Sequence, residues 1–132
     1  MNKEIANKWA AALRSGDYPQ GTGCLYDGKA FCCLGVLVEQ FRIEFPGIIQ
    51  REDAENMSVY QIKKVNTATN YTGVLPGIVS TWAGMASVTG VFRGGFGYGK
   101  FNPAPVLVCL NDDDGLLFNQ IADLIDNFSE LL

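Results

Sequence analysis

The cations, glycines and aromatic rings of residues 91–101 are the part of the sequence best suited to hold a small anionic molecule. This segment, VFRGGFGYGKF, places four glycines and two aromatic rings between Arg93 and Lys100. Glycines let backbone N–H groups approach a ligand closely, and both cations pair with phosphate. Phe96 and Tyr98 can stack on a base, a contact worth about 1–3 kcal/mol in nucleic-acid complexes. The segment therefore predicts either a ligand-binding loop or a surface hairpin that only makes contacts between subunits.

The charge distribution also favours an anion site in the middle of the chain. Residues 56–111 contain Lys63, Lys64, Arg93 and Lys100 but no Asp or Glu, which gives a charge of +4. The rest of the chain has six cations and fourteen carboxylates, a charge of −8, so the total is −4. A general nucleic-acid-binding protein needs a broad basic face, and we therefore expect no nucleic-acid partner. Four ordinary solvated charges explain the middle stretch equally well.

The glycine-rich segment only partly matches the phosphate-binding loop G-x-x-x-x-G-K-[ST]. Gly94, Gly99 and Lys100 fit the pattern, but Phe101 stands where the magnesium-binding hydroxyl is required. The prolines at 103 and 105 also prevent the long helix that must follow such a loop. A nucleotide hydrolase of this kind is therefore not expected.

Other catalytic and metal-binding patterns are absent from the sequence. There is no histidine, and the four cysteines, at 24, 32, 33 and 109, lack the C-x2-C spacing of structural zinc. The NDDDG run fails as a calcium loop, because alignment on Gly115 puts Leu110 and Ile121 at ligand positions. No G-x-S-x-G motif occurs, and no carboxylate pair has a spacing that singles it out. We predict no catalytic residue, no metal and no cofactor, and we expect the thiols to be reduced and buried.

Apolar residues at helical spacing predict the elements that must position these residues. The first helix covers residues 3–15 and has an apolar stripe of Ile5, Trp9 and Leu13. A second helix begins near Cys33 and ends before Pro46, and a short one begins at Leu75-Pro76. The last helix has Asp114 as its expected N-cap. Its stripe is the clearest in the chain and contains Leu117, Ile121, Leu124, Ile125 and Phe128.

Turn residues and alternation predict the strands. Asp27-Gly28 is a strong signal for a tight hairpin between two short strands. Residues 57–65 alternate well enough to form another strand, whereas residues 51–56 are expected to be a solvated turn. The prediction is a single α+β domain over residues 1–132. Its small antiparallel sheet contains the Asp27-Gly28 hairpin and packs against the first, second and last helices.

The totals suit a globular protein that is not embedded in a membrane. At 132 residues and 48% apolar content the chain can bury one core. No apolar run approaches the ~18–20 residues of a membrane span, and the first residues lack the apolar centre of a secretory signal. We therefore expect a cytoplasmic location and no membrane contact.

The two ends of the sequence resemble one family. The run KWAAALRSGDYPQGTGCLYDGKAFCCLGVL, residues 8–37, resembles short phage proteins that share a W-x-x-A-L-R-S-G-x-Y-x-Q-G…C-C-L-G-V-L opening. The tail LNDDDGLLFNQIADLI, residues 110–125, is similar to that family's N-D-x-G-x-x-F-x-x-I-A-D-L-I ending. The resemblance places Arg14, Tyr18 and Gln20 in the family motif, and it does not include residues 91–101.

The resemblance implies a phage accessory protein, and one known role of such proteins is to sequester the nucleotide signals of bacterial antiviral immunity. The first hypothesis is therefore a homo-oligomer in the host cytoplasm that captures a cyclic dinucleotide or a cyclic ADP-ribose derivative without catalysis. The expected ligand-binding residues are Arg14, Arg93 and Lys100 for phosphates, Tyr18, Phe96 and Tyr98 for stacking, and Gln20 for polar edges. One alternative is a protein-interaction factor that inhibits a host enzyme through the exposed loop. Another is a small nucleotide-cleaving enzyme.

Overall fold

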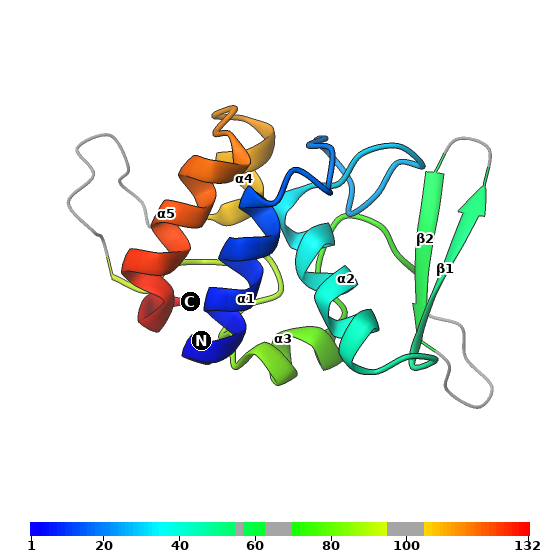
Figure 1. Cartoon of the computed structure of the whole chain (residues 1–132), viewed down its shortest axis with the longest axis horizontal. Coiled ribbons are helices and arrows are strands. Elements are labelled where there is room, and N and C mark those ends of the chain that lie inside the picture. Colours follow the sequence, from blue (N-terminus) through cyan, green and yellow to red (C-terminus); the bar gives the residue numbers. More distant parts are fainter. Residues whose placement is uncertain (55–56, 63–69, 95–104) are drawn as a thin grey trace.

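The computed structural model describes residues 1–54, 57–62, 70–94 and 105–132, and Figure 1 shows its elements. The α-helices are α1 (Lys3–Arg14), α2 (Cys33–Glu44), α3 (Gly77–Ala83), α4 (Leu107–Asp112) and α5 (Phe118–Phe128). The strands are β1 (Ile49–Ala54), β2 (Met57–Ile62) and β3 (Asn70–Tyr71), and a 3-10 helix, η1, spans Ser129–Leu131. One compact domain of the α+β class results, as the sequence predicts.

Helix α1 lies between α5 and α2, and the β1–β2 pair stands on the far side of α2 (Figure 1). The Asn2 side chain caps α1 by accepting from the N–H groups of Glu4 and Ile5, at 2.9 and 3.3 Å. The Trp9 indole N–H donates to the Cys33 carbonyl at 3.0 Å, which joins α1 to the start of α2. The apolar stripe of α1 is buried and consists of Ile5, Ala6, Trp9, Ala10 and Leu13.

Helix α2 crosses the centre of the fold and is almost entirely buried from Cys33 to Val38. A side chain at Gly35 would overlap the carbonyl of Leu25, so glycine permits the loop before α2 to lie directly on the helix. The helix begins and ends where the sequence predicts, before Pro46. Its last two residues, Ile43 and Glu44, are exposed, and the chain then passes through Gly47, which has a φ of 90°, into β1.

Helix α5 begins later than the sequence predicts. Its N-cap is Leu117 rather than Asp114, and Leu117 is 60% exposed instead of forming part of the apolar stripe. The first free N–H group, that of Phe118, donates to the side-chain oxygen of Gln20 at 2.8 Å. The Gln120 side chain accepts from the Leu117 N–H at 2.8 Å. A side chain from the other end of the chain therefore caps α5.

The acidic run that was expected to start α5 ends α4 instead. Residues 107–110 form a helical turn because their apolar side chains pack into the core, where Leu107 and Leu110 are buried. The N–H groups of Asp113 and Asp114 both donate to the Cys109 carbonyl, at 2.8 and 3.0 Å. Together with the bond from the Leu116 N–H to the Leu110 carbonyl at 2.9 Å, these bonds satisfy two of the last carbonyls of α4.

Among the described residues, the three-stranded sheet lies within residues 49–71. Strands β1, β2 and β3 pair antiparallel in that order, with Arg51 opposite Tyr60 and Tyr60 opposite Tyr71. The strand predicted after residue 57 is confirmed, whereas the prediction of a turn at residues 51–54 is wrong, because these residues form most of β1. Pairing with β2 gives this polar segment the backbone hydrogen bonds of a strand.

The Asp27-Gly28 turn forms, but it is not part of the sheet. Asp27 Oδ1 accepts from two backbone N–H groups of the turn, both at 2.8 Å, and Gly28 has a φ of 96°. The flanking segments make a single antiparallel bridge, Tyr26 with Phe31, rather than two strands. The Phe31 N–H donates instead to the Pro19 carbonyl at 2.8 Å, so the preceding loop takes the place of a longer hairpin.

Candidate anion-binding site

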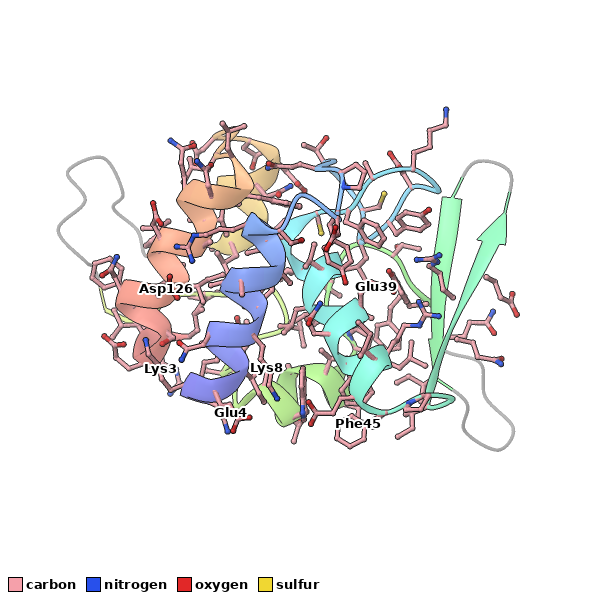
Figure 2. All side chains as sticks on the ribbon, viewed as in Figure 1. Lys3, Glu4, Lys8, Glu39, Phe45 and Asp126 are labelled. Atoms are coloured by element: carbon pink, nitrogen blue, oxygen red, sulfur yellow. The ribbon has the colours of Figure 1, made fainter. Side chains whose placement is uncertain are left out.

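Two arginines from different elements converge on one carboxylate beside the sheet. Glu39 projects from α2 toward the β1–β2 pair (Figure 2). Arg42 Nη1 lies 2.7 and 2.8 Å from the two Glu39 carboxylate oxygens, and Arg51 Nη1 lies 3.4 Å from Oε1. The Tyr60 hydroxyl donates to the same Oε1 at 2.7 Å. We call these four residues, Glu39, Arg42, Arg51 and Tyr60, the arginine cluster.

The local fold explains why these four side chains meet. Glu39 and Arg42 are three residues apart on α2 and therefore lie on one face of the helix. Arg51 and Tyr60 are directly opposite each other in the antiparallel β1–β2 pair, so their side chains lie on the same face of the sheet. Arg42 Nε also donates to the Ile49 carbonyl at 3.3 Å, which holds the end of α2 against β1.

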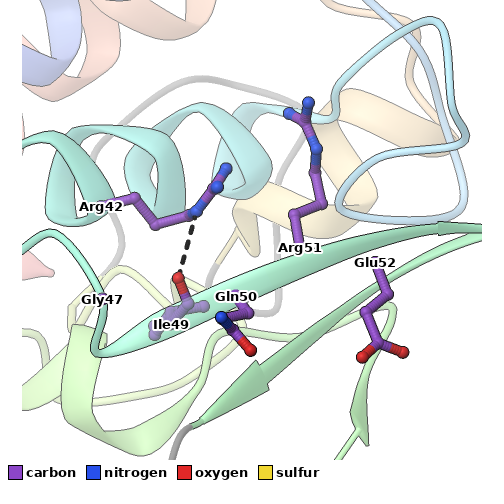
Figure 3. A pocket seen from close by; sticks show the side chains of 6 residues that line it. All are labelled: Arg42, Gly47, Ile49, Gln50, Arg51 and Glu52. Atoms are coloured by element: carbon purple, nitrogen blue, oxygen red, sulfur yellow. Dashed lines mark hydrogen bonds between the residues drawn. The ribbon is translucent and has the colours of Figure 1, made fainter.

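An open pocket of about 390 Å³ lies beside the arginine cluster (Figure 3). Its lining residues are Arg42, Gly47, Ile49, Gln50, Arg51 and Glu52. The volume lies within the ~300–1,000 Å³ range of pockets that hold small ligands. The Arg42 and Arg51 side chains keep 27% and 24% of their surface exposed, so both remain accessible to a ligand in the pocket.

Aromatic rings hold Arg51 in place. Its guanidinium carbon lies 4.3 Å from the centre of the Tyr26 ring, and Tyr26 stacks on Phe31 with ring centres 4.3 Å apart. The Tyr18 ring meets the other side of Phe31 edge-on at 5.4 Å. Cation–π contact and stacking therefore connect Arg51 to the loop between α1 and α2.

The electrostatics of the cluster favour an anion. Two guanidinium groups and one carboxylate leave a charge of +1 on side chains that are largely withdrawn from water. Burial raises the pKa of Tyr60, and the negative charge of Glu39 raises it further, so the phenol stays protonated as a hydrogen-bond donor. The arrangement supplies donors and positive charge, which is the chemistry of phosphate binding.

Arg14, a predicted phosphate ligand, faces α5. Its Nη2 lies 2.6 Å from Asp123 Oδ1, and its Nη1 lies 2.7 Å from Asp126 Oδ2. Hydrogen bonds that Arg14 donates to the two carboxylates raise the pKa of its guanidinium. Lys3 adds a bond to the Asp126 carbonyl at 2.7 Å (Figure 2). A phosphate would have to compete with two carboxylates for this guanidinium, so its observed contacts give Arg14 a structural role in joining α1 to α5.

Gln20, the predicted reader of polar edges, is also held by protein groups. Besides capping α5, its Nε2 donates to the Leu116 carbonyl at 2.7 Å and lies 3.4 Å from Asn111 Oδ1. Asn111 is buried and in turn donates to the Gly21 carbonyl at 2.9 Å and accepts from the Cys33 N–H at 3.2 Å. This network joins the opening segment to the segment between α4 and α5.

The other predicted ligand residues lie apart from one another. The Tyr18 hydroxyl accepts from Gln40 Nε2 at 3.1 Å, and its ring lines a second open cleft, of about 430 Å³, between α1 and α2. Arg93 is exposed, and its backbone N–H donates to the Leu131 carbonyl at 2.7 Å, beside η1. Phe96, Tyr98 and Lys100 lie outside the described residues.

The arginine cluster was not predicted from the sequence. Glu39 and Arg42 were not singled out within the second helix, and Arg51 was expected in a solvated turn. The i, i+3 spacing of Glu39 and Arg42 was a signal that could be read from the sequence. The contribution of Arg51 depends on the pairing of β1 with β2, which no local pattern indicated.

The chain belongs to the family described as Domain of unknown function (DUF8296), whose model matches residues 1–129. A search of curated proteins and a search of solved structures each gave no match to the chain. Within the described ranges, no helix is long and apolar enough to cross a membrane. In the same ranges, no three His, Cys, Asp or Glu side chains are grouped so as to hold a metal ion.

Proposed function

We propose that this protein binds a small phosphate-bearing nucleotide in the pocket beside the arginine cluster and holds it without catalysis. The observation that carries the proposal is the convergence of Arg42 and Arg51 on Glu39 at the wall of a 390 Å³ pocket. Guanidinium groups are the side chains best suited to phosphate, and aromatic contacts already hold one of them in a fixed orientation. A fixed donor costs less conformational entropy when a ligand binds.

The proposal includes a biological setting that rests on the resemblance of the two chain ends to short phage proteins. In this setting the protein is a homo-oligomer in the host cytoplasm and sequesters a cyclic dinucleotide or a cyclic ADP-ribose derivative. The site residues predicted from the sequence define a competing location for the ligand. Arg14 is paired with two carboxylates, whereas the two guanidinium groups of the cluster converge on one, Glu39, and this difference favours the arginine cluster over that location.

Calorimetric titration with cyclic dinucleotides, cyclic mononucleotides and cyclic ADP-ribose tests the proposal. We expect at least one of these ligands to bind the wild-type protein, and Arg42→Gln and Arg51→Gln to reduce its affinity by at least about tenfold each. Lys29→Gln is the matched control, because Lys29 is an exposed cation outside the pocket. Absence of heat and of a thermal shift with every ligand would remove the proposal.

Recovery of the ligand from the complex separates binding from cleavage. We expect the ligand to be recovered intact after the complex is incubated and the protein is denatured. Recovery of a cleaved product would replace sequestration by a nucleotide-cleaving activity. The alternative of a host-enzyme inhibitor depends on Phe96 and Tyr98, which lie outside the described residues, and no described contact favours it.

A further inference from the structure

We infer that the pocket selects a phosphodiester, which carries one negative charge, over a phosphomonoester, which carries two, and that Glu39 sets this selectivity. The inference rests on the proposed function, because it names the class of phosphate that the same pocket holds. It assigns Glu39 a role as a specificity-determining residue. Its carboxylate lies close to a ligand that is bound by the same two guanidinium groups, and it repels the second negative charge of a phosphomonoester.

The charge balance of the cluster carries the first step. Arg42 and Arg51 contribute +2 and Glu39 contributes −1, so a bound monoanion neutralises the cluster whereas a dianion leaves an excess negative charge. The cost of taking an anion out of water grows with the square of its charge, but its attraction to a fixed site grows only linearly. The cluster, with a charge of +1, therefore favours a monoanion, and the Glu52 carboxylate that lines the same pocket adds to the repulsion of a dianion.

The position of Glu39 carries the second step. Its side chain is only 13% exposed and lies against both guanidinium groups, so a ligand on their pocket side lies within roughly 6 Å of the carboxylate. At that separation and an effective dielectric constant of about 40, each additional ligand charge changes affinity about tenfold. Because Glu39 is withdrawn from water, salt screens this repulsion less than it screens exposed charges.

Glu52 strengthens the same preference from the opposite side of the pocket. It lines the pocket next to Arg51 and accepts from Gln61 Nε2 at 3.1 Å, which holds its carboxylate on the sheet. In Figure 3 its side chain points away from Arg42 and Arg51. A terminal phosphomonoester that extends out of the pocket meets this second negative charge. Glu52 is exposed, so we expect its effect to be smaller than that of Glu39.

Matched pairs of ligands test the inference. The pairs are adenosine 3′,5′-cyclic monophosphate with adenosine 5′-monophosphate, and cyclic di-AMP with its linear form ending in a phosphomonoester. We expect the wild-type protein to bind the cyclic member of a pair at least about tenfold more tightly at pH 7.5 and constant ionic strength. Glu39→Gln keeps the size of the side chain and removes its charge, and we expect it to reduce this ratio by about tenfold. Glu4→Gln, at an exposed carboxylate on α1, is the control and should leave the ratio unchanged.

A second measurement needs no variant and therefore does not depend on whether Glu39→Gln folds. The second pKa of a phosphomonoester is about 6, so lowering the pH from 7.5 to about 5 converts 5′-AMP largely to a monoanion. We expect the preference of the wild-type protein for the cyclic nucleotide to shrink over this range. Absence of binding by any ligand overturns the proposed function together with this inference. Binding with equal or greater affinity for the phosphomonoester, or a ratio that neither Glu39→Gln nor the change in pH reduces, overturns this inference alone.

Discussion

Asn111 is the residue whose replacement tests most sharply how the two ends of the chain are joined. Its Nδ2 donates to the Gly21 carbonyl and to Asp112 Oδ1, at 2.9 and 2.6 Å. Its Oδ1 accepts from the buried Cys33 N–H at 3.2 Å, and Gln20 Nε2 lies 3.4 Å from the same atom. Asn111 itself is 1% exposed, so water cannot replace these bonds without a change in the surrounding structure.

Asn111→Ala removes the side-chain partners of Gly21 and Cys33. Leaving the buried Cys33 N–H unsatisfied costs about 1–3 kcal/mol, and loss of the bond to the half-buried Gly21 carbonyl adds about 1 kcal/mol, so we expect a loss of about 3 kcal/mol in the free energy of unfolding. Neither group gains a new partner unless the loop at residues 19–23 moves. For a chain of this length, the loss corresponds to a fall in Tm of about 10 °C.

Urea unfolding followed by far-UV circular dichroism measures the effect. The matched control is Asn127→Ala, because Asn127 is exposed and makes one local bond, to the Asp123 carbonyl within α5. We expect the control to change the free energy of unfolding by less than about 0.5 kcal/mol. If Asn111→Ala and Asn127→Ala have the same stability within about 1 kcal/mol, the network does not hold the two ends of the chain together.

Three further predictions concern Arg14, Gly35 and the cysteines. Arg14→Gln should lower the free energy of unfolding by only about 0.5–1 kcal/mol, because both partner carboxylates are more than a third exposed. The loss should be smaller at high salt, and ligand affinity should not change. A tenfold loss of affinity would restore Arg14 as a ligand residue. Gly35→Ala should abolish soluble, cooperatively folding protein, since a Cβ overlaps the Leu25 carbonyl; a variant with wild-type Tm contradicts this packing. Burial raises the pKa of Cys32 to about 11 and that of Cys33 well above its usual value, so both thiols should stay protonated at pH 8. They should not react with a disulfide reagent until urea is added, whereas the exposed Cys109 should react in the native protein. Rapid reaction of all four cysteines would contradict the burial of Cys32 and Cys33.

Local patterns in the sequence were sufficient to predict α1 and α2 but not α4. Asn2 caps α1 through its own neighbouring N–H groups, and Trp9 lies on a buried stripe that repeats every turn. The predicted start of α5 was wrong because the side chain that caps this helix, Gln20, lies 98 residues before Phe118 in the sequence. The nearest acidic residues therefore gave a misleading signal.

The sheet shows the same dependence on distant partners. The Asp27-Gly28 turn was predicted from its own two residues. The hairpin does not extend beyond one bridge, because the Phe31 N–H donates to the Pro19 carbonyl. The candidate site was harder still, because Arg51 meets Glu39 only after the chain reverses between α2 and β1. A sequence read one segment at a time contains no signal for that meeting.

The residues that carry the resemblance at the two chain ends are partners of one another in the structure. Arg14 pairs with Asp123, and Gln20 bonds to the backbone at Leu116 and Phe118. These contacts pack α1 and the first loop against α5. They leave the arginine cluster, which lies outside the closing motif, as the location for ligand binding in our proposal.

The affinity of cyclic di-AMP for the wild-type protein and for Arg51→Gln, measured by calorimetry beside Lys29→Gln, tests the central proposal most directly. Circular dichroism must first show that both variants fold. We predict binding to the wild-type protein and to Lys29→Gln with the same affinity, and a loss of at least about tenfold in Arg51→Gln. Equal affinity of all three proteins would place the ligand outside the arginine cluster and contradict the account.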